Sequence, residues 1–365
     1  MKEDIGKAQH DSGAGDGNRS RNMLFKAITV GISFVLALLA GEMIARFYYF
    51  GFDSLSFQKI DTFVPLGVSG NLRAAEYPGV GVELKPGLDT VYKLRVLRTN
   101  SQGLRDKEYS LDKPPRTFRV AAVGDSYTMG HGVNIEHVYH SLLEDRLSQE
   151  ASAMKYEFIN FGVGGYDLLN YLRVIRQKAL NYKPDMILIG FCAKNDMSVP
   201  SSFQKEKSNK IYHPKETRHP FFTESYLLYL IKNSRLTFAI KDRMYRLKTS
   251  QENEALTQRQ KLQQQTAYVE ECFRQLGEIT KEHKLPVVIA YLITYDQGEE
   301  RRDIVARLAH EQGLWFVDST PYFRGKEVRK YLFIPELDEH PNEKAHKIYA
   351  DMLYDFFRKE HLLRE

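Results

Sequence analysis

The feature that most constrains the fold is the alternation of apolar, β-branched runs with amphipathic runs across residues 117–357. The strand-like runs occupy residues 117–124, 156–162, 185–192, 285–292 and 314–318. Segments between them, such as 137–149 and 167–182, repeat apolar residues every three or four positions, as amphipathic helices do. Strands alternating with helices predict an α/β fold, with a mostly parallel five-stranded sheet covered by helices on both faces.

Residues 197–284 interrupt this alternation, because they are far longer than the single helix that a crossover needs. Apolar spacing predicts one helix at 224–236 and another from Leu262 through Ile279. Two interpretations of this helical insertion stay open. It is either an elaborated crossover or a cap over the functional site that selects the substrate.

The amino terminus predicts a membrane anchor. Residues 1–22 are polar and rich in Gly, Ser and charge, which favours a disordered leader. An uncharged stretch of 15 residues then lies between Lys26 and Glu42, and its apolar flanks extend it to a transmembrane anchor over 23–46. The alternative is a cleaved signal peptide, which the long polar leader disfavours.

The charges beside this anchor predict its orientation. Arg19, Arg21 and Lys26 precede it, so the leader is expected in the cytoplasm and the rest of the chain outside, either periplasmic or extracellular. Arg46 follows the anchor and makes the asymmetry small. Residues 47–116 contain Gly, Pro and scattered β-formers, and we interpret them as a stalk followed by short strands.

Composition excludes several classes of function. The net charge is +5, with no dense basic block, so a nucleic-acid partner is not expected. Cys192 and Cys272 form neither a disulfide framework nor a metal motif, and both are predicted to be buried. The spacing of His131, His137 and His140 likewise favours packing or surface roles over a metal site.

The first strand ends abruptly in Gly124, Asp125 and Ser126, which is either a plain turn or a presented nucleophile. Polar or glycine-rich stretches also follow later strands, at 161–167, 192–196 and 337–346. The carboxyl ends of parallel strands meet at one edge of a sheet, where ligands bind. These four stretches are therefore predicted to converge.

Their residue types suit ester cleavage by a serine. A nucleophilic Ser126 needs a base, which His340 can supply, and an orienting carboxylate, which Asp338 can supply from two residues earlier. The oxyanion needs hydrogen-bond donors. The backbone N–H groups of Ser126 and Gly165 and the side-chain amide of Asn195 are the candidates.

With these motifs the chain resembles the SGNH hydrolase superfamily, the GDSL-type lipases and esterases. The first block matches Gly-Asp-Ser at 124–126, and later blocks match Gly165, Asn195, and the pair Asp338 and His340. The match runs from about residue 117 to residue 357, in the family's order. Similar bacterial members also carry an amino-terminal membrane segment and an Asn-Ser-x-Gly-x-Arg stretch, here at 100–105.

The resemblance implies a three-layer, flavodoxin-like hydrolase domain over 117–365. It implies a membrane-anchored serine hydrolase that cleaves an O-acyl ester, such as an acetyl ester, through an acyl-enzyme, without a metal or cofactor. The substrate would be an acylated glycan or lipid outside the cytoplasmic membrane. Two alternatives stay open: an O-acetyltransferase acting on an extracellular or cell-wall polysaccharide, and a catalytically idle adaptor of an envelope assembly.

Some residues near the motifs have competing interpretations. Ala193 stands where the family's third block usually has glycine, which predicts a slightly different loop around Asn195. Asp125 is expected to cap the helix after it, and Asp196 to brace its own loop. His346 is the alternative base to His340, but the family match favours the latter.

Overall fold

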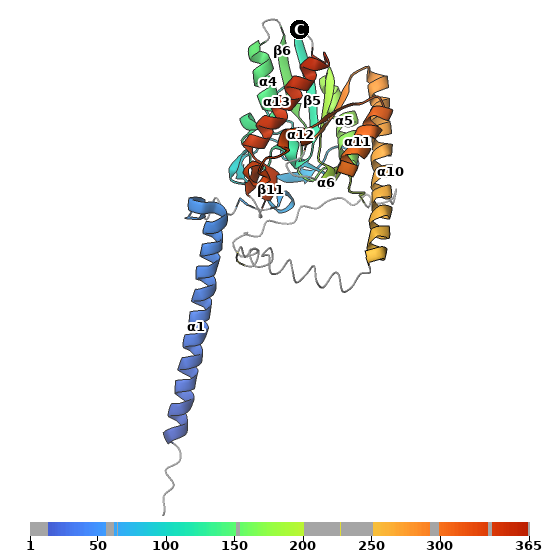
Figure 1. Ribbon diagram of the computed structural model, residues 1–365. Helices are drawn as coiled ribbons and strands as arrows, with labels where there is room; N and C mark the ends of the chain where they lie inside the picture. Colours follow the sequence, from blue (N-terminus) through green and yellow to red (C-terminus); the bar gives the residue numbers. More distant parts are fainter. Residues whose placement is uncertain are drawn as a thin grey trace, which may run out of the picture.

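The structure is a computed structural model that describes residues 14–55, 62–63, 65–150, 154–200, 227, 251–292, 299–334 and 338–363. Its centre is a parallel sheet of five strands in the order β6-β5-β7-β8-β9 (Figure 1). The strands are β5 (Thr117–Gly124), β6 (Lys155–Asn160), β7 (Met186–Phe191), β8 (Val287–Tyr291) and β9 (Trp315–Asp318). All five predicted strands are confirmed, and the order is that of a flavodoxin-like sheet.

Helices cover both faces of the sheet, which makes three layers (Figure 1). One layer contains α4 (Tyr139–Glu150), α12 (Thr320–Phe323) and α13 (Glu343–Lys359). The other contains α5 (Leu168–Gln177), α10 (Gln251–His283) and α11 (Glu299–Glu311). Alternate residues of β5 serve the two layers, because Phe118 and Val120 pack in one core and Ala121 and Val123 in the other. Burial on both faces explains why this strand is apolar throughout.

The strand order creates a crevice at one edge of the sheet. After β5 the chain turns to β6 on one side and then crosses to β7 on the other, so the loops after β5 and β7 diverge. Two short helices begin at this edge, α3 (Ser126–Met129) and α6 (Ala193–Asp196). A small antiparallel hairpin of β10 (Leu332–Ile334) and β11 (Asp338–Pro341) completes it. Short 3₁₀ helices lie in three connections of the domain. They are η3 (Ile135–His137) between α3 and α4, η4 (Ala179–Tyr182) between α5 and β7, and η6 (Val328–Tyr331) between α12 and β10.

The described part of the extension expected at 47–116 consists of short helical turns and two hairpins packed on the sheet domain. The turns are η1 (Gly51–Leu55) and η2 (Leu66–Val68). The hairpins pair β1 (Leu72–Ala74) with β2 (Val82–Leu84), and β3 (Asp89–Tyr92) with β4 (Arg95–Arg98). Leu72, Leu84 and Leu97 are buried in the same core as α5 and α10. The predicted short strands are present, but this extension is part of the packed domain.

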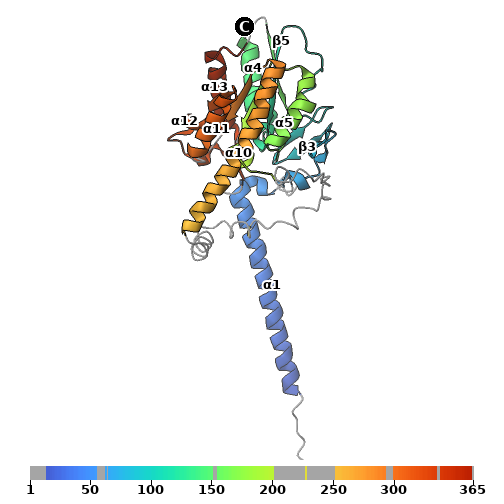
Figure 2. The same ribbon diagram turned by 90° about the vertical axis from the view of Figure 1, so that its right-hand side faces the viewer.

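A single long helix, α1 (Ala14–Phe50), leaves the domain on the side of β11 and α6 (Figures 1 and 2). It is long and apolar enough to cross a membrane, and its most apolar window is fully exposed. The structure differs from the expected disordered leader at residues 14–22, which continue this helix. Extending an existing helix adds a hydrogen bond per residue, which explains the continuation.

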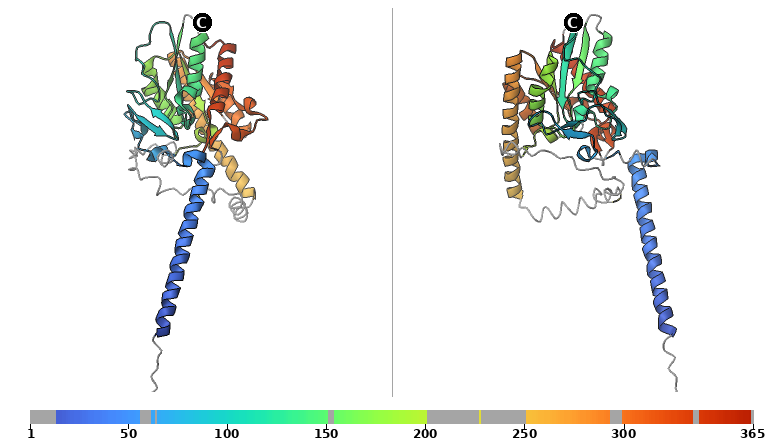
Figure 3. Two further views of the ribbon diagram at one scale, coloured as in Figure 1. Left: turned by 90° about the vertical axis from the view of Figure 1, so that its left-hand side faces the viewer. Right: turned by 180° about the vertical axis from the view of Figure 1, so that it is seen from behind.

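Helix α10 confirms the helix predicted from Leu262 through Ile279, and it lies beside α5 and α11 (Figure 3). The other predicted helix of the insertion, at 224–236, lies outside the described residues except for residue 227. Cys192 and Cys272 are both buried, as expected.

Candidate active site

Ser126 is the first residue of α3, and only Asp125 separates it from strand β5. Asp125 caps this helix as predicted, because its Oδ1 accepts a hydrogen bond of 2.9 Å from the N–H of Tyr127. Gly124 lets the helix pack closely on the sheet, since a Cβ there would lie 2.0 Å from Oγ1 of Thr128. The Gly-Asp-Ser turn therefore holds a nearly buried hydroxyl at the carboxyl edge of the sheet.

His340 meets this hydroxyl from a different part of the chain. Its Nε2 lies 2.8 Å from Oγ of Ser126, although 214 positions separate the two residues. Nδ1 of His340 faces the opposite way and makes a short contact with Oδ1 of Asp338. The same carboxylate oxygen accepts the backbone N–H of His340 at 3.1 Å. The proximity predicted for Ser126, His340 and Asp338 is confirmed.

A lysine from the extension also reaches this carboxylate. Nζ of Lys93 lies 3.1 Å from Oδ2 of Asp338, and both side chains are largely buried. Burial raises the pKa of Asp338, but the hydrogen bond and charge of His340 and the charge of Lys93 lower it more. The pKa of Asp338 is therefore below its ordinary value, and the carboxylate remains ionised beside the imidazole. No sequence motif around Lys93 signals this contact.

The predicted oxyanion donors lie on the loops after β5, β6 and β7. Asn195, in α6, donates from Nδ2 to Oδ2 of Asp125 at 2.6 Å, so this amide is tied to the Gly-Asp-Ser turn. Gly165 has a φ of +90°, and no atom lies within 4 Å of a Cβ built there. The backbone conformation, and not a lack of space, therefore explains the glycine. Ala193 begins α6 in an ordinary helical conformation, which tolerates its Cβ.

Two buried aspartates brace these loops. Asp196 accepts the N–H of Cys192 at 2.7 Å and the hydroxyl of Tyr171 at 2.8 Å, which confirms its bracing role. Burial raises the pKa of Asp125 above its ordinary value, although its hydrogen bonds from Tyr127 and Asn195 oppose that shift. Asp125 therefore has a second structural task that the sequence did not indicate, because it also orients the amide of Asn195.

The other histidines take packing roles. His346 is fully buried and stacks on Tyr139, so it is not placed as a base for Ser126. His140 is also buried, with Nε2 3.2 Å from the carbonyl oxygen of Thr128. His131 lies against His340, with ring centroids 4.6 Å apart, a neighbour that its spacing in the sequence did not reveal. Within the described ranges, no group of three or more His, Cys, Asp or Glu side chains could hold a metal ion.

The Asn-Ser-x-Gly-x-Arg stretch supports the segment that follows the nucleophile helix. The guanidinium of Arg105 is buried and donates to the carbonyl oxygens of Met129 and Val133, at 2.9 and 2.7 Å. Oδ1 of Asn100 accepts the N–H of Leu104, which shapes the turn that presents this arginine. The stretch therefore stabilises the site without touching Ser126 in the structure.

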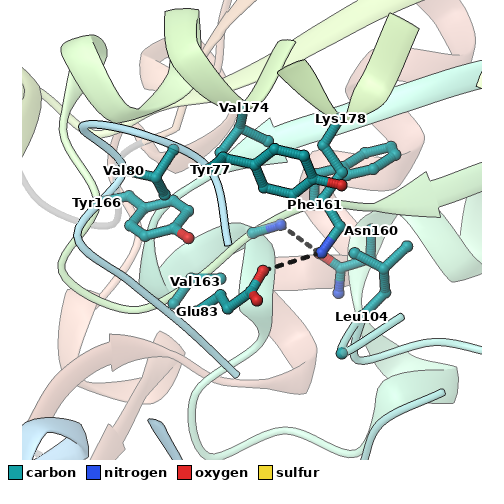
Figure 4. A pocket seen from close by; sticks show the side chains of 12 residues that line it. Tyr77, Val80, Glu83, Leu104, Asn160, Phe161, Val163, Tyr166, Val174 and Lys178 are labelled. Carbon is teal, nitrogen blue, oxygen red and sulfur yellow. Dashed lines mark hydrogen bonds and ion pairs between the residues drawn. The ribbon is translucent and has the colours of Figure 1, made fainter. Parts of the chain in front are cut away.

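A small pocket lies at the seam between the extension and the sheet domain, and Figure 4 shows its lining. Nζ of Lys178 and Oε2 of Glu83 form an ion pair of 3.2 Å across it. The hydroxyl of Tyr166, next to Gly165, donates to the carbonyl oxygen of Val82 at 2.6 Å. With a volume of about 20 Å³, the pocket has room for little more than one water molecule. This seam fastens the extension to the loop that carries Gly165.

Comparisons with known proteins agree with this architecture. The model of the GDSL-like lipase/acylhydrolase family matches residues 122–348. No curated protein sequence is a detectable match to the chain. Among solved structures, a two-domain esterase active on acetylated mannans is similar, with 16% identity and a TM-score of 0.42 over 67% of this chain. The match covers 49% of that esterase, about half its length.

Two further solved structures are similar over most of their own length. An acetyl xylan esterase from Geobacillus stearothermophilus has 16% identity and a TM-score of 0.37, covering 68% of this chain and 97% of that one. A G-D-S-L family protein from Desulfitobacterium hafniense has 16% identity and the same TM-score, covering 65% and 98%. The family match spans most of the chain, including the Gly-Asp-Ser turn and the Asp-Glu-His strand. The chain therefore belongs to the GDSL-like lipase/acylhydrolase (SGNH) family.

Proposed function

We propose that this protein is an esterase that uses Ser126 as its nucleophile, His340 as general base and Asp338 as the carboxylate that orients the base. The observation that carries the proposal is the distance of 2.8 Å between Oγ of Ser126 and Nε2 of His340. The contact of Asp338 with Nδ1 supports it, because Nδ1 then carries the proton and Nε2 has a lone pair to accept one.

The reaction then proceeds in two balanced halves. Oγ of Ser126 attacks the acyl carbon while its proton passes to His340, and the imidazolium returns that proton to the departing alkoxide. The alcohol leaves and an acyl-serine remains. His340 next takes a proton from water, the resulting hydroxide attacks the acyl carbon, and the imidazolium returns the proton to Ser126. The carboxylic acid product leaves, and the ionised Asp338 stabilises the imidazolium in both halves.

The oxyanion would be stabilised by the N–H groups of Ser126 and Gly165 and by the amide of Asn195. An amide nitrogen carries two hydrogens, and one of those on Asn195 points at Asp125. That bond fixes the direction of the other. A donor aimed before the charge develops needs no reorganisation during the reaction, which is the source of its catalytic benefit.

We also propose that α1 anchors the enzyme in the cytoplasmic membrane, with the hydrolase domain of residues 117–365 outside. Arg19, Arg21 and Lys26 are exposed near the amino end of the helix. Arg46, at the other end, is buried and paired with Glu42 at 3.0 Å, so it adds little charge to that side. This pattern supports a cytoplasmic amino end. A domain on this anchor would present its site close to the bilayer surface.

The test of the reaction uses the full chain in detergent with 4-nitrophenyl acetate. We expect turnover that falls by about 10³-fold or more in Ser126→Ala. Acetate released equally with and without an acetyl-accepting glycan supports the hydrolase. Transfer that depends on the glycan would instead assign an O-acetyltransferase, and absence of turnover by folded wild type would refute the proposal.

The test of the location uses membrane-impermeant maleimide on intact cells. The native Cys192 and Cys272 are buried, so their background labelling is expected to be low. We expect Ser110→Cys, on the exposed surface of the domain, to be labelled and Arg21→Cys to be protected until the membrane is opened. The reverse pattern would refute the orientation, and processing that removes Arg21 would indicate a cleaved signal peptide.

A further inference from the structure

The extension that precedes the hydrolase domain supplies a charged residue to the active site. We propose that Lys93 is a positioning residue for the esterase reaction, which holds the carboxylate of Asp338 and offsets its charge beside His340. Nζ of Lys93 lies 3.1 Å from Oδ2 of Asp338, the oxygen that does not contact the imidazole. This inference rests on the proposed roles of Asp338 and His340.

The two carboxylate oxygens of Asp338 have different partners. Oδ1 accepts from Nδ1 and from the backbone N–H of His340, and Oδ2 faces Lys93. A buried carboxylate with one unpartnered oxygen is costly and is free to rotate about its terminal torsion. The ammonium group removes both problems, because it pairs with the second oxygen and fixes the plane of the carboxylate.

The backbone of Lys93 shows that the structure forces this residue into place. Lys93 and Leu94 form the two-residue turn between β3 and β4, with φ values of 51° and 62°. Both positions favour Gly, Asn or Asp, because a larger side chain crowds the backbone at positive φ. Thr62 holds the turn by accepting both N–H groups, through its carbonyl oxygen at 3.0 Å and its hydroxyl at 3.1 Å. Such strain persists only where the surroundings impose it, and it is often found at functional sites.

Aromatic rings also contact the side chain of Lys93 and the elements around it. Nζ of Lys93 lies 3.9 Å from the ring centroid of Phe63. Phe63 packs against Phe50, the last residue of α1, and stacks on Phe333 in β10, with centroids 5.2 and 6.2 Å away. The cation therefore lies between the end of the membrane-anchor helix and the hairpin that carries Asp338 and His340. Through Lys93, the amino-terminal extension therefore contributes a side chain that contacts the proposed active site.

The ammonium also affects the pH dependence of the reaction. The charge of Lys93 acts on the carboxylate and the imidazole together, so its removal should change the pH profile of the reaction, which the loss of a purely steric role would not. The titratable or charged groups around Asp338 and His340 include Tyr92 and Lys93 of the hairpin, Arg105, Asp125, Tyr127, His131, His346, and the exposed pair Glu339 and Lys194. Burial lowers the pKa of His131 well below its ordinary value, and the nearby His340 adds to this effect, so His131 stays neutral in the range that matters.

The test compares pH profiles of kcat/KM for 4-nitrophenyl acetate in the full chain. In Lys93→Met we expect a plateau about tenfold lower and an acid limb displaced from its wild-type position, because one charge beside Asp338 is lost. Lys93→Arg keeps the charge and should restore the position of the acid limb. Lys93→Asn suits the turn better, which should offset part of the stability lost with the ion pair, yet it should show the same kinetic defects as Lys93→Met.

The matched control is Arg98→Met, on the same hairpin. It removes an equal charge and an ion pair of 2.9 Å with Asp89, but both side chains are mostly exposed. We expect its profile to equal that of wild type. Wild-type profiles in folded Lys93→Met and Lys93→Asn would overturn the inference while leaving the proposed function intact. Failure of the proposed function would instead appear in the wild type, as absence of turnover that depends on Ser126.

Discussion

The turn that carries Ser126 is built by the sheet itself, whereas the hairpin that carries Asp338 and His340 is held from outside by the amino-terminal extension. At the turn, Gly124 removes a side chain that would collide with Thr128, and Asp125 caps the helix locally. At the hairpin, the carboxylate of Asp338 pairs with Lys93, which lies more than two hundred positions earlier. The proposed nucleophile is therefore held by residues adjacent to it in sequence, whereas the carboxylate beside the proposed base contacts a distant part of the chain.

The comparison predicts its largest effect at the hairpin. In Asp338→Asn we expect kcat to fall by about 10³- to 10⁴-fold, because the neutral amide neither orients the imidazole nor stabilises its charged form. KM should change little, since Asp338 lies behind the base. The measurement is steady-state kinetics on 4-nitrophenyl acetate, with thermal unfolding to show that the variant is folded. A loss of less than tenfold would remove Asp338 from the proposed triad.

The next effect concerns the turn. In Asp125→Asn, the cap to Tyr127 can persist, but the new amide would face Nδ2 of Asn195 with hydrogens on both sides. Asn195 should then rotate, and kcat should fall by about 10²-fold, as expected for the loss of one oxyanion donor.

The matched variant is Asn195→Ala, which removes the same donor directly. Because both changes remove one interaction, the double variant should be no worse than about threefold below either single variant. Multiplied losses in the double variant would show that Asp125 acts independently of Asn195.

A third effect tests how the sheet builds the turn. In Gly124→Ala, the new Cβ would lie 2.0 Å from Oγ1 of Thr128, so the helix has to shift. We expect the free energy of unfolding to fall by about 2 kcal/mol, measured by denaturant titration. Adding Thr128→Ala removes Oγ1 but leaves the Cβ of residue 128, which lies 2.6 Å from the new Cβ, so it should recover only part of that loss. A single variant as stable as wild type would mean that the turn is not sterically constrained.

The smallest effect separates structural histidines from the proposed base. Burial lowers the pKa of His346 from 6.5 to about 3, so the unfolded chain binds a proton that the folded chain does not. The neutral, buried His346 therefore contributes fully to the free energy of unfolding above pH 6.5. This contribution is lost as the pH falls from 6.5 toward 3. In His346→Gln this loss should disappear. The free energy of unfolding should then depend on pH less steeply, by about 1.4 kcal/mol per pH unit. Urea titrations at pH 4 to 7 would measure it, and equal slopes would contradict the assignment.

The sequence predicted what depends on local patterns. The apolar runs of β5 and β7 identified the sheet, and the short blocks at Ser126, Gly165 and Asp338 identified its functional edge. These features are readable because a strand's burial and a turn's geometry depend on adjacent residues.

The rest depended on contacts that no local pattern contains. Lys93 reaches Asp338 only because the hairpins of the extension, expected as part of a stalk, pack on the sheet domain. His131 lies beside His340 only after α3 and β11 come together. The start of α1 at residue 14 arises because a helix, once formed, continues into polar sequence.

The most direct test of the account is active-site labelling of the folded full chain with a fluorophosphonate, read by peptide mass spectrometry. We predict one covalent adduct, on Ser126, that forms far more slowly in His340→Gln and is absent in Ser126→Ala. Labelling of another residue, or no labelling of folded wild-type protein, would contradict the claim that His340 activates Ser126.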